Sequence, residues 1–396
     1  MKLYGAAMLA AVGCGAAIPP VPSQGGPPWR ELTSEHFTVW TDGSREAGDA
    51  LIQRMEDLRH AVIGIGFRAA AGPGRVFVLA LRDRYEVSAY VGEGVGAVAV
   101  TSRGSLYQPF ILLPVETATQ RQFEVAAHEL THSISHLVIA RQPRWFAEGL
   151  AEYFETIVID HAGGTVELGR APTYQGRPVR QERPYTFTTL FGCGRTTQCE
   201  GSRFYSTAWA LVTFLMNKHP GAFAAYEQSL IDTDGNHDQA WLDAFGTGSL
   251  DSLFMDLRMW LQSGSHQVLR FNATFRTWPI AERPLGDADV HAARALMRLQ
   301  FVGTDEQVKA ELAGALALER THVLAQLVAF RLDEKKPLDR ELARATTTAH
   351  PDDWRAWFLL ATALGAGDEA DAARAKVCEL VAVNPAIVSP VTCPVR

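Results

Sequence analysis

The chain of 396 residues lacks several features that mark common classes of protein. Its formal net charge is −7 and it has no basic run, which argues against a nucleic-acid-binding protein. Beyond the first residues, no segment is long and apolar enough to cross a membrane. No C-x-x-C spacing occurs, which argues against a zinc ribbon. With 47% hydrophobic residues the chain can bury sizeable cores, and its length predicts about two domains.

Cysteines are few, and their positions point to export. Apart from Cys14, the sequence has Cys193 and Cys199, separated by a polar loop, and Cys378 and Cys393 near the end of the chain. A short-range disulfide within each pair is natural in an oxidising compartment. The pattern therefore predicts two disulfides and a location outside the cytoplasm.

The N-terminus is typical of a bacterial export signal. Lys2 precedes an apolar stretch over 3–13, which is too short to span a bilayer. Ala11-Val12-Gly13-Cys14 resembles a lipobox, so we expect residues 1–14 to be a lipoprotein-type signal with Cys14 as the lipidated residue. Residues 15–28 are rich in Pro and Gly and predict a tether. The expected location is the periplasm or outer membrane, with membrane contact only through the lipid; cleavage of an ordinary signal peptide nearby is the alternative.

The most informative segment is His128-Glu129-Leu130-Thr131-His132, an H-E-x-x-H pattern. Residues 120–140 contain no Gly or Pro and carry apolar residues at helical spacing, so the pattern lies within a predicted helix. Both imidazoles would then share one face and could bind one Zn²⁺, with Glu129 beside it to take a proton from water. Two packed histidines beside a solvated glutamate are the alternative.

A second predicted helix, over 144–154, could complete the site. Zinc needs a third protein ligand, and Glu148 follows His132 by sixteen residues, enough for the chain to turn and return. Glu152 lies one turn further and suits a role in holding the far ring nitrogen of a ligand histidine. The alternative for both is a solvated helix face. His136 continues the i, i+4 series, but eight residues of helix rise about 12 Å, too far for it to share a metal with His128.

These two motifs together, H-E-L-T-H and W-F-A-E-G-L-A-E-Y-F, resemble the gluzincins, and most closely the bacterial peptidase-MA-like families, over roughly residues 30–230. The resemblance implies Glu148 as the third zinc ligand. It also implies that Tyr205, which opens the helix-like run 205–215, polarises the substrate carbonyl; a tyrosine packed under the zinc helix is the alternative, and Tyr153 is a weaker candidate. The G-x-M-E-N segment of related aminopeptidases is missing, which favours cleavage inside chains.

The expected fold class is α+β. The resemblance implies a zincin-like catalytic domain over 29–275. Strand-like segments at 37–40, 76–81, 97–100 and 110–113 and helix-like segments at 47–63 and 251–262 fall within it. From the resemblance we expect a small, mostly antiparallel sheet, one edge of which pairs with an extended peptide or protein substrate. The sequence does not identify that edge strand.

The C-terminal third has a different composition. After a predicted linker at 276–286, Ala and Leu dominate residues 287–396, and Pro351 and Pro385 are separated by 34 residues, the period of a tetratricopeptide repeat. We expect an all-α, tetratricopeptide-like domain with a protein partner as one role; a generic helical bundle is the alternative.

The sequence thus predicts an envelope metallopeptidase with one zinc ion held by His128, His132 and Glu148. Two alternatives stay open. One is a lipoprotein adaptor that binds partners through helical repeats beside an inactive or structural zinc domain. The other is a zinc hydrolase that acts on a non-protein amide of the envelope, such as peptidoglycan stem peptides.

Overall fold

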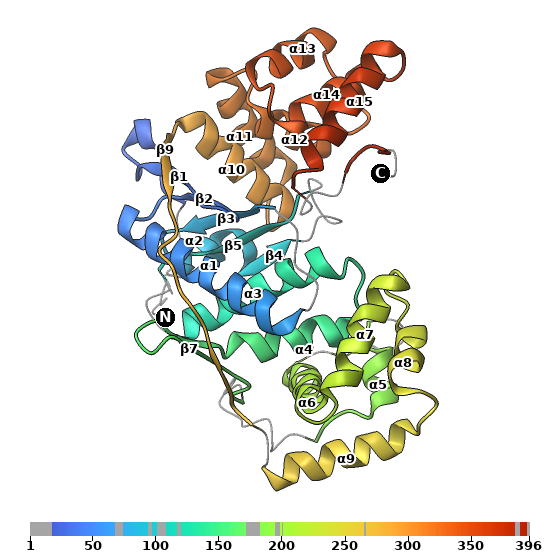
Figure 1. Cartoon of the computed structure of the whole chain (residues 1–396). Coiled ribbons are helices and arrows are strands. Elements are labelled where there is room, and N and C mark those ends of the chain that lie inside the picture. Colours follow the sequence, from blue (N-terminus) through green and yellow to red (C-terminus); the bar gives the residue numbers. More distant parts are fainter. Residues whose placement is uncertain are drawn as a thin grey trace, which may run out of the picture.

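The computed structural model of the protein describes residues 18–67, 74–93, 97–100, 108–116, 120–171, 183–194, 199, 201–264, 267–384 and 389–393. The predicted export signal, with Cys14, lies outside these residues. The described residues form an α+β fold in which a mixed six-stranded sheet has helices on both faces (Figure 1). The predicted α+β class is therefore confirmed.

The strand order of the large sheet is β4-β5-β3-β2-β1-β9. Its strands are β1 (Trp29–Thr33), β2 (Phe37–Thr41), β3 (Val76–Leu81), β4 (Val98–Val100), β5 (Phe110–Pro114) and β9 (Ala281–Leu285). The central pairs β2–β3 and β3–β5 are parallel, whereas β1–β2, β1–β9 and β4–β5 are antiparallel. The expected mostly antiparallel sheet is thus mixed, because the helix α1 (Arg45–Gly66) carries the chain back so that β3 runs alongside β2.

The two faces of the sheet belong to two hydrophobic cores. Along β3, Val78 and Ala80 face the core that contains α1, whereas Leu79 and Leu81 face the core that contains the C-terminal helices. Successive side chains of a strand point to opposite faces, and a strand covered on both faces is apolar throughout. This explains the uninterrupted apolar run that predicted the strand.

The first core continues away from the sheet into the lower part of Figure 1. Its larger helices are α3 (Gln120–Val138), α4 (Arg144–Glu155), α6 (Ser202–Lys218), α7 (Pro220–Asp232) and α9 (Leu250–Ser263). The shorter helices are α5 (Phe187–Gly192) and α8 (His237–Phe245), and a second sheet contains β6 (Val158–Asp160), β7 (Thr165–Leu168) and β8 (Leu269–Asn272).

The second core joins the sheet to the helices drawn at the top of Figure 1. These are α10 (Asp287–Gln300), α11 (Asp305–Leu318), α12 (Val323–Leu332), α13 (Arg340–Ala349), α14 (Trp354–Leu364) and α15 (Asp368–Val381), and α2 (Arg84–Val91) packs in the same core. Residues 287–381 are therefore helical, as expected. Most of their buried side chains belong to the core shared with the sheet, and α13, α14 and α15 add a small cluster of their own around Ala343, Leu360 and Ala373.

The segment predicted as a linker is built into the fold. Residues 281–285 form the edge strand β9 against β1. Just before it, the side chain of Gln53 donates to the carbonyl of Trp278 at 2.7 Å and accepts from its N–H at 2.9 Å. Trp278 itself is buried. Pro279 and Pro284 favoured a loop, but an edge strand accepts proline because one side of it needs no ladder hydrogen bonds.

The predicted tether also differs from the structure. From Ile18 onward its residues pack on α10: Val21 is buried in the second core, and the side chain of Arg294 donates to the carbonyl of Pro19 at 2.6 Å. Residues 22–24 form a 3-10 helix. A proline-rich segment has few backbone conformations, so it loses little conformational entropy when it packs along a helix.

Both predicted disulfides are present, Cys193–Cys199 and Cys378–Cys393. Such bonds persist in oxidising compartments, which indicates a protein located outside the cytoplasm. Among the described helices, none is long and apolar enough to span a membrane.

Candidate metal centre

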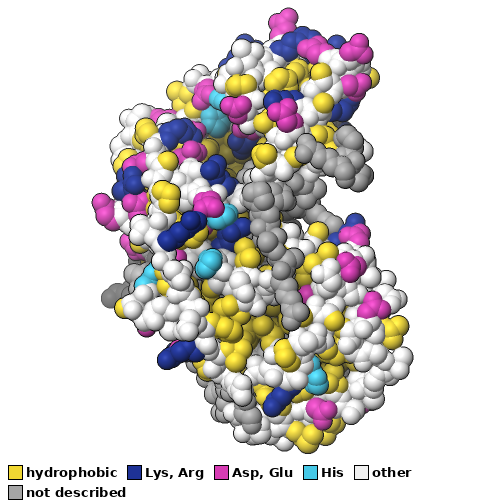
Figure 2. Space-filling model, in the orientation of Figure 1, with side chains coloured by type: hydrophobic (Ala, Val, Ile, Leu, Met, Phe, Trp, Pro, Cys, Tyr) yellow, Lys and Arg dark blue, Asp and Glu magenta, His cyan; other side chains and the backbone are white. Residues whose placement is uncertain are grey.

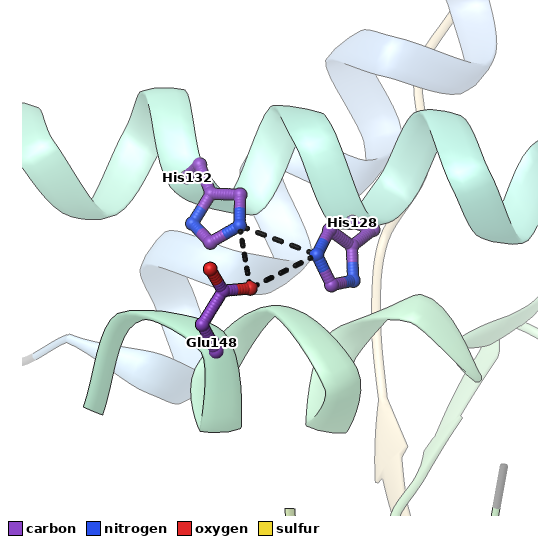
Figure 3. Close-up of side chains that lie close together, drawn as sticks. All are labelled: His128, His132 and Glu148. Carbon is purple, nitrogen blue, oxygen red and sulfur yellow. Dashed lines mark hydrogen bonds and ion pairs between the residues drawn. The ribbon is translucent and has the colours of Figure 1, made fainter. Parts of the chain in front are cut away.

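Two neighbouring helices build the site. The apolar face of α3, which includes Phe123, Leu130 and Ile134, is buried against the sheet and α1. That orientation leaves His128 and His132 together on another face, directed at α4. Pro143 precedes α4 and turns the chain so that this helix returns along α3, with Glu148 facing the two imidazoles (Figure 3).

The three facing atoms form a nearly regular triangle. The Nε2 atoms of His128 and His132 are 3.2 Å apart, and Oε2 of Glu148 lies 3.5 Å from the first and 3.3 Å from the second. Zinc binds histidine nitrogen and carboxylate oxygen at ~2.0–2.1 Å, and a tetrahedron with arms of that length has edges of about 3.3–3.4 Å. The donor types and their spacing fit a tetrahedral metal ion. The three side chains could hold a metal ion, and they are 15–18% exposed, so solvent can reach it.

A second carboxylate fixes the orientation of His128. Oε2 of Glu155 lies 3.0 Å from Nδ1 of this ring. A hydrogen bond from Nδ1–H to a carboxylate leaves Nε2 free to bind a metal. We expected Glu152 in this place. In the structure Glu155 makes the contact, because His128 lies further from the turn than His132 and so faces a later part of the returning helix.

The electrostatics of the site reflect this crowding of acids and imidazoles. Burial alone would lower the pKa of His128, but the hydrogen bonds to Glu148 and Glu155 outweigh it and raise that pKa well above its usual value. Burial would likewise raise the pKa of Glu148, yet the two imidazoles hold it far below its usual range. Burial and the neighbouring Glu155 raise the pKa of Glu152 to about 8. Metal binding requires a deprotonated Nε2 on His128, so a metal ion would compete with the proton that the raised pKa favours there.

The expected general base lies beside the sheet. Glu129 is adjacent to His128 in α3, and its Oε2 accepts a hydrogen bond from the main-chain N–H of Ala99 at 2.7 Å. Ala99 is the central residue of β4, the outermost strand of the large sheet next to β5. β4 and β9 are the two edge strands of this sheet among the described residues, and β4 is the one that contacts α3.

Tyr205 lies near the site because α4 and α6 pack very closely. A methyl group on Gly149 would lie 2.6 Å from the main-chain oxygen of Ala208, so only glycine permits this approach. Tyr205 precedes Ala208 by about one helical turn. Burial and Glu148 raise the pKa of its hydroxyl, whereas Arg144 acts in the opposite direction.

Arg144 is a further residue at the site that the sequence did not identify. Its guanidinium stacks on the ring of Phe204 at 4.3 Å and donates to the carbonyl of Cys199 at 2.9 Å. The disulfide Cys193–Cys199 therefore anchors a cation beside Tyr205. An arginine four residues before Glu148 on one helix face was the available signal.

Two other polar residues lie outside the triangle: His136, which the rise of the helix excluded as a ligand beside His128, and Tyr153, the weaker tyrosine candidate. His136 bonds the carbonyl of His132 through Nδ1 at 2.8 Å, one turn beyond the triangle. Tyr153 is fully buried in the first core, where its ring lies against that of Phe154. Among the described residues, neither side chain belongs to either group that could hold a metal ion, His128 with His132 and Glu148 or His128 with Glu152 and Glu155.

Comparison with known proteins does not identify the chain. No family model matches the sequence, and none of the curated proteins matches it. The assignment of function therefore depends on the site itself.

Proposed function

We propose that this protein is a zinc-dependent peptidase that cleaves within polypeptide chains. The observation that supports this most strongly is the triangle of His128, His132 and Glu148, whose edges of 3.2–3.5 Å match tetrahedral zinc coordination. A purely structural zinc site usually has four protein ligands, whereas three ligands leave one position for water or substrate. The adjacent Glu129 and the partial exposure of the triangle favour the catalytic type.

The roles of the residues follow from their chemistry. Bound zinc would polarise the scissile carbonyl and acidify the attacking water. The Glu129 carboxylate accepts the proton of that water and passes it to the leaving amine. The Tyr205 hydroxyl donates to the carbonyl oxygen as negative charge develops there. Glu155 keeps the His128 ring in the tautomer that binds metal.

We also propose that the enzyme works in the bacterial cell envelope, anchored by a lipid on Cys14. The two disulfides support a location outside the cytoplasm. Hydrophobic side chains gather on the lower part of the molecule on the face shown in Figure 2. Such a surface suits unfolded polypeptide as the substrate.

The test combines metal analysis with a digest. We expect one zinc ion per chain, and hydrolysis of a denatured protein library that stops after chelation and returns with added zinc. Glu129→Gln should keep the zinc and lose hydrolysis, whereas His136→Asn on the same helix should keep both. A zinc-loaded protein that cleaves purified cell wall and no polypeptide would redirect the proposal to peptidoglycan amides. A chain that binds no zinc would refute it.

A further inference from the structure

The strand β4 is the part of the large sheet that lies next to the proposed catalytic site. It is the outermost strand and pairs antiparallel with β5, with Ala99 opposite Ile111. In an antiparallel pair, opposite residues alternate between those that exchange ladder hydrogen bonds and those whose N–H and C=O point away. The N–H of Ala99 is directed to Oε2 of Glu129 at 2.7 Å, so Ala99 belongs to the second kind.

This donor has properties that a side chain would not offer. The ladder between β4 and β5 fixes the strand, and the alternate side chains of β5 are buried in the cores on its two faces, Ile111 in one and Phe110 in the other. A main-chain N–H held in this way has no rotamers to lose when it binds. A hydrogen bond to a carboxylate is also stronger than one between neutral groups.

We propose that the main-chain N–H of Ala99 positions Glu129 for catalysis. It holds one carboxylate oxygen in place and leaves the other to accept the proton from water. Ala99 is then a positioning residue that acts through its backbone, and the inference rests on the proposed peptidase function. Without this bond the carboxylate samples other rotamers, and fewer molecules have the base aligned for proton transfer.

The expected effect falls on turnover. The bond contacts the base and not the metal ligands, so its loss should leave zinc binding intact. The removal of one hydrogen bond to a charged group corresponds to a fall of about 10- to 100-fold in kcat. KM should change by less than about threefold, because the bond contributes to alignment and not to substrate affinity.

The experiment removes the N–H of Ala99 by two routes whose side effects differ: an ester also weakens the Val98 carbonyl as an acceptor, whereas proline also fixes φ. Lactic acid incorporated in place of Ala99 converts the amide to an ester, and Ala99→Pro removes the same donor genetically, at an edge position where proline is tolerated. Ala99→Gly keeps the N–H and reports the effect of the methyl group alone. Zinc content, melting temperature, kcat and KM are measured for all three variants and for the wild type.

We expect the ester and proline variants to bind zinc and to lose kcat relative to Ala99→Gly, with KM conserved. Equal kcat in the ester and glycine variants would overturn the positioning role while the peptidase function stands. A higher kcat in the ester variant would also overturn it, because the bond would then restrain the base. If the proline variant does not fold, the ester variant decides. A zinc-loaded wild type that cleaves nothing would overturn the peptidase function and the inference with it.

Discussion

Gly149 offers the sharpest test of the site's architecture. It follows Glu148 at the contact between α4 and α6, and a Cβ atom there would lie 2.6 Å from the Ala208 oxygen and 2.6 Å from Cγ2 of Val212. Ordinary van der Waals contact begins at 3.4 Å, so the helices must separate by about 0.8 Å to accept alanine. Overpacking of this kind costs about 1–3 kcal/mol.

The same shift moves Tyr205 away from Glu148. A misplacement near 1 Å can cost about 100-fold in rate, so we expect Gly149→Ala to lower kcat by about 10- to 100-fold. The zinc should stay bound, because its three ligands lie on α3 and α4. Thermal unfolding, zinc content and peptide hydrolysis together distinguish these effects.

A matched control lies in α1. Gly64 is exposed within that helix, and a Cβ atom there would meet nothing within 4 Å. Gly64→Ala should therefore stabilise the protein by roughly 0.5–1 kcal/mol through the lower entropy of the unfolded chain. If Gly149→Ala were as stable as Gly64→Ala and fully active, the close packing of α4 on α6 would be refuted, and with it the placement of Tyr205.

Two further predictions follow from buried carboxyl groups. Glu155→Gln should weaken zinc affinity by about 10-fold or more, measured in competition with a chromophoric chelator, because the bond to Nδ1 of His128 loses its charge. Glu152→Gln should weaken zinc affinity less. Equal losses in the two variants would contradict the role of Glu155 as the partner of His128. Burial, and then Asp42, raise the pKa of Glu86 to about 8 from a usual value of 4.5. Between pH 4.5 and about 8, the folded chain therefore holds a proton on Glu86 that the unfolded chain has released. The free energy of unfolding should fall by a few kcal/mol as the pH rises through this range. Glu86→Gln should flatten this dependence in urea titrations at pH 5.5 and 8.5, and an unchanged slope would show that another group causes it.

Local patterns identified most of the local structure. Apolar residues at helical spacing predicted α3, and apolar runs predicted β3 and β5, because burial on one or two faces leaves a direct trace in sequence. The strand β9 left no such trace. Its residues are mostly exposed, Pro284 lies within it and Pro279 shortly before it, and it exists because β1 offers an unpaired edge. Pairing between segments about 250 residues apart depends on the fold as a whole.

The site shows the same difference between features set by local sequence and features set by the fold as a whole. The positions of His128, His132 and Glu148 follow from spacing within two helices joined by a short turn. Glu155 was missed because the choice between it and Glu152 depends on the exact register of α4 on α3. Ala99 could not be found from its residue type at all, because it acts through a backbone N–H that every residue except proline carries.

The helical region contributes to the site even though it lies on the opposite face of the sheet. Phe110 and Leu112 of β5 are buried in the core that contains α10, α11, α12, α14 and α15, and the ring of Phe110 lies against that of Phe301 just after α10. The same strand carries β4 through its ladder, and β4 binds Glu129. A separable adaptor domain would have its main hydrophobic core among its own helices. These helices instead bury one face of β5, the strand that supports β4 beside the proposed base. Their packing thus stabilises the strands that hold the carboxylate of Glu129 in place.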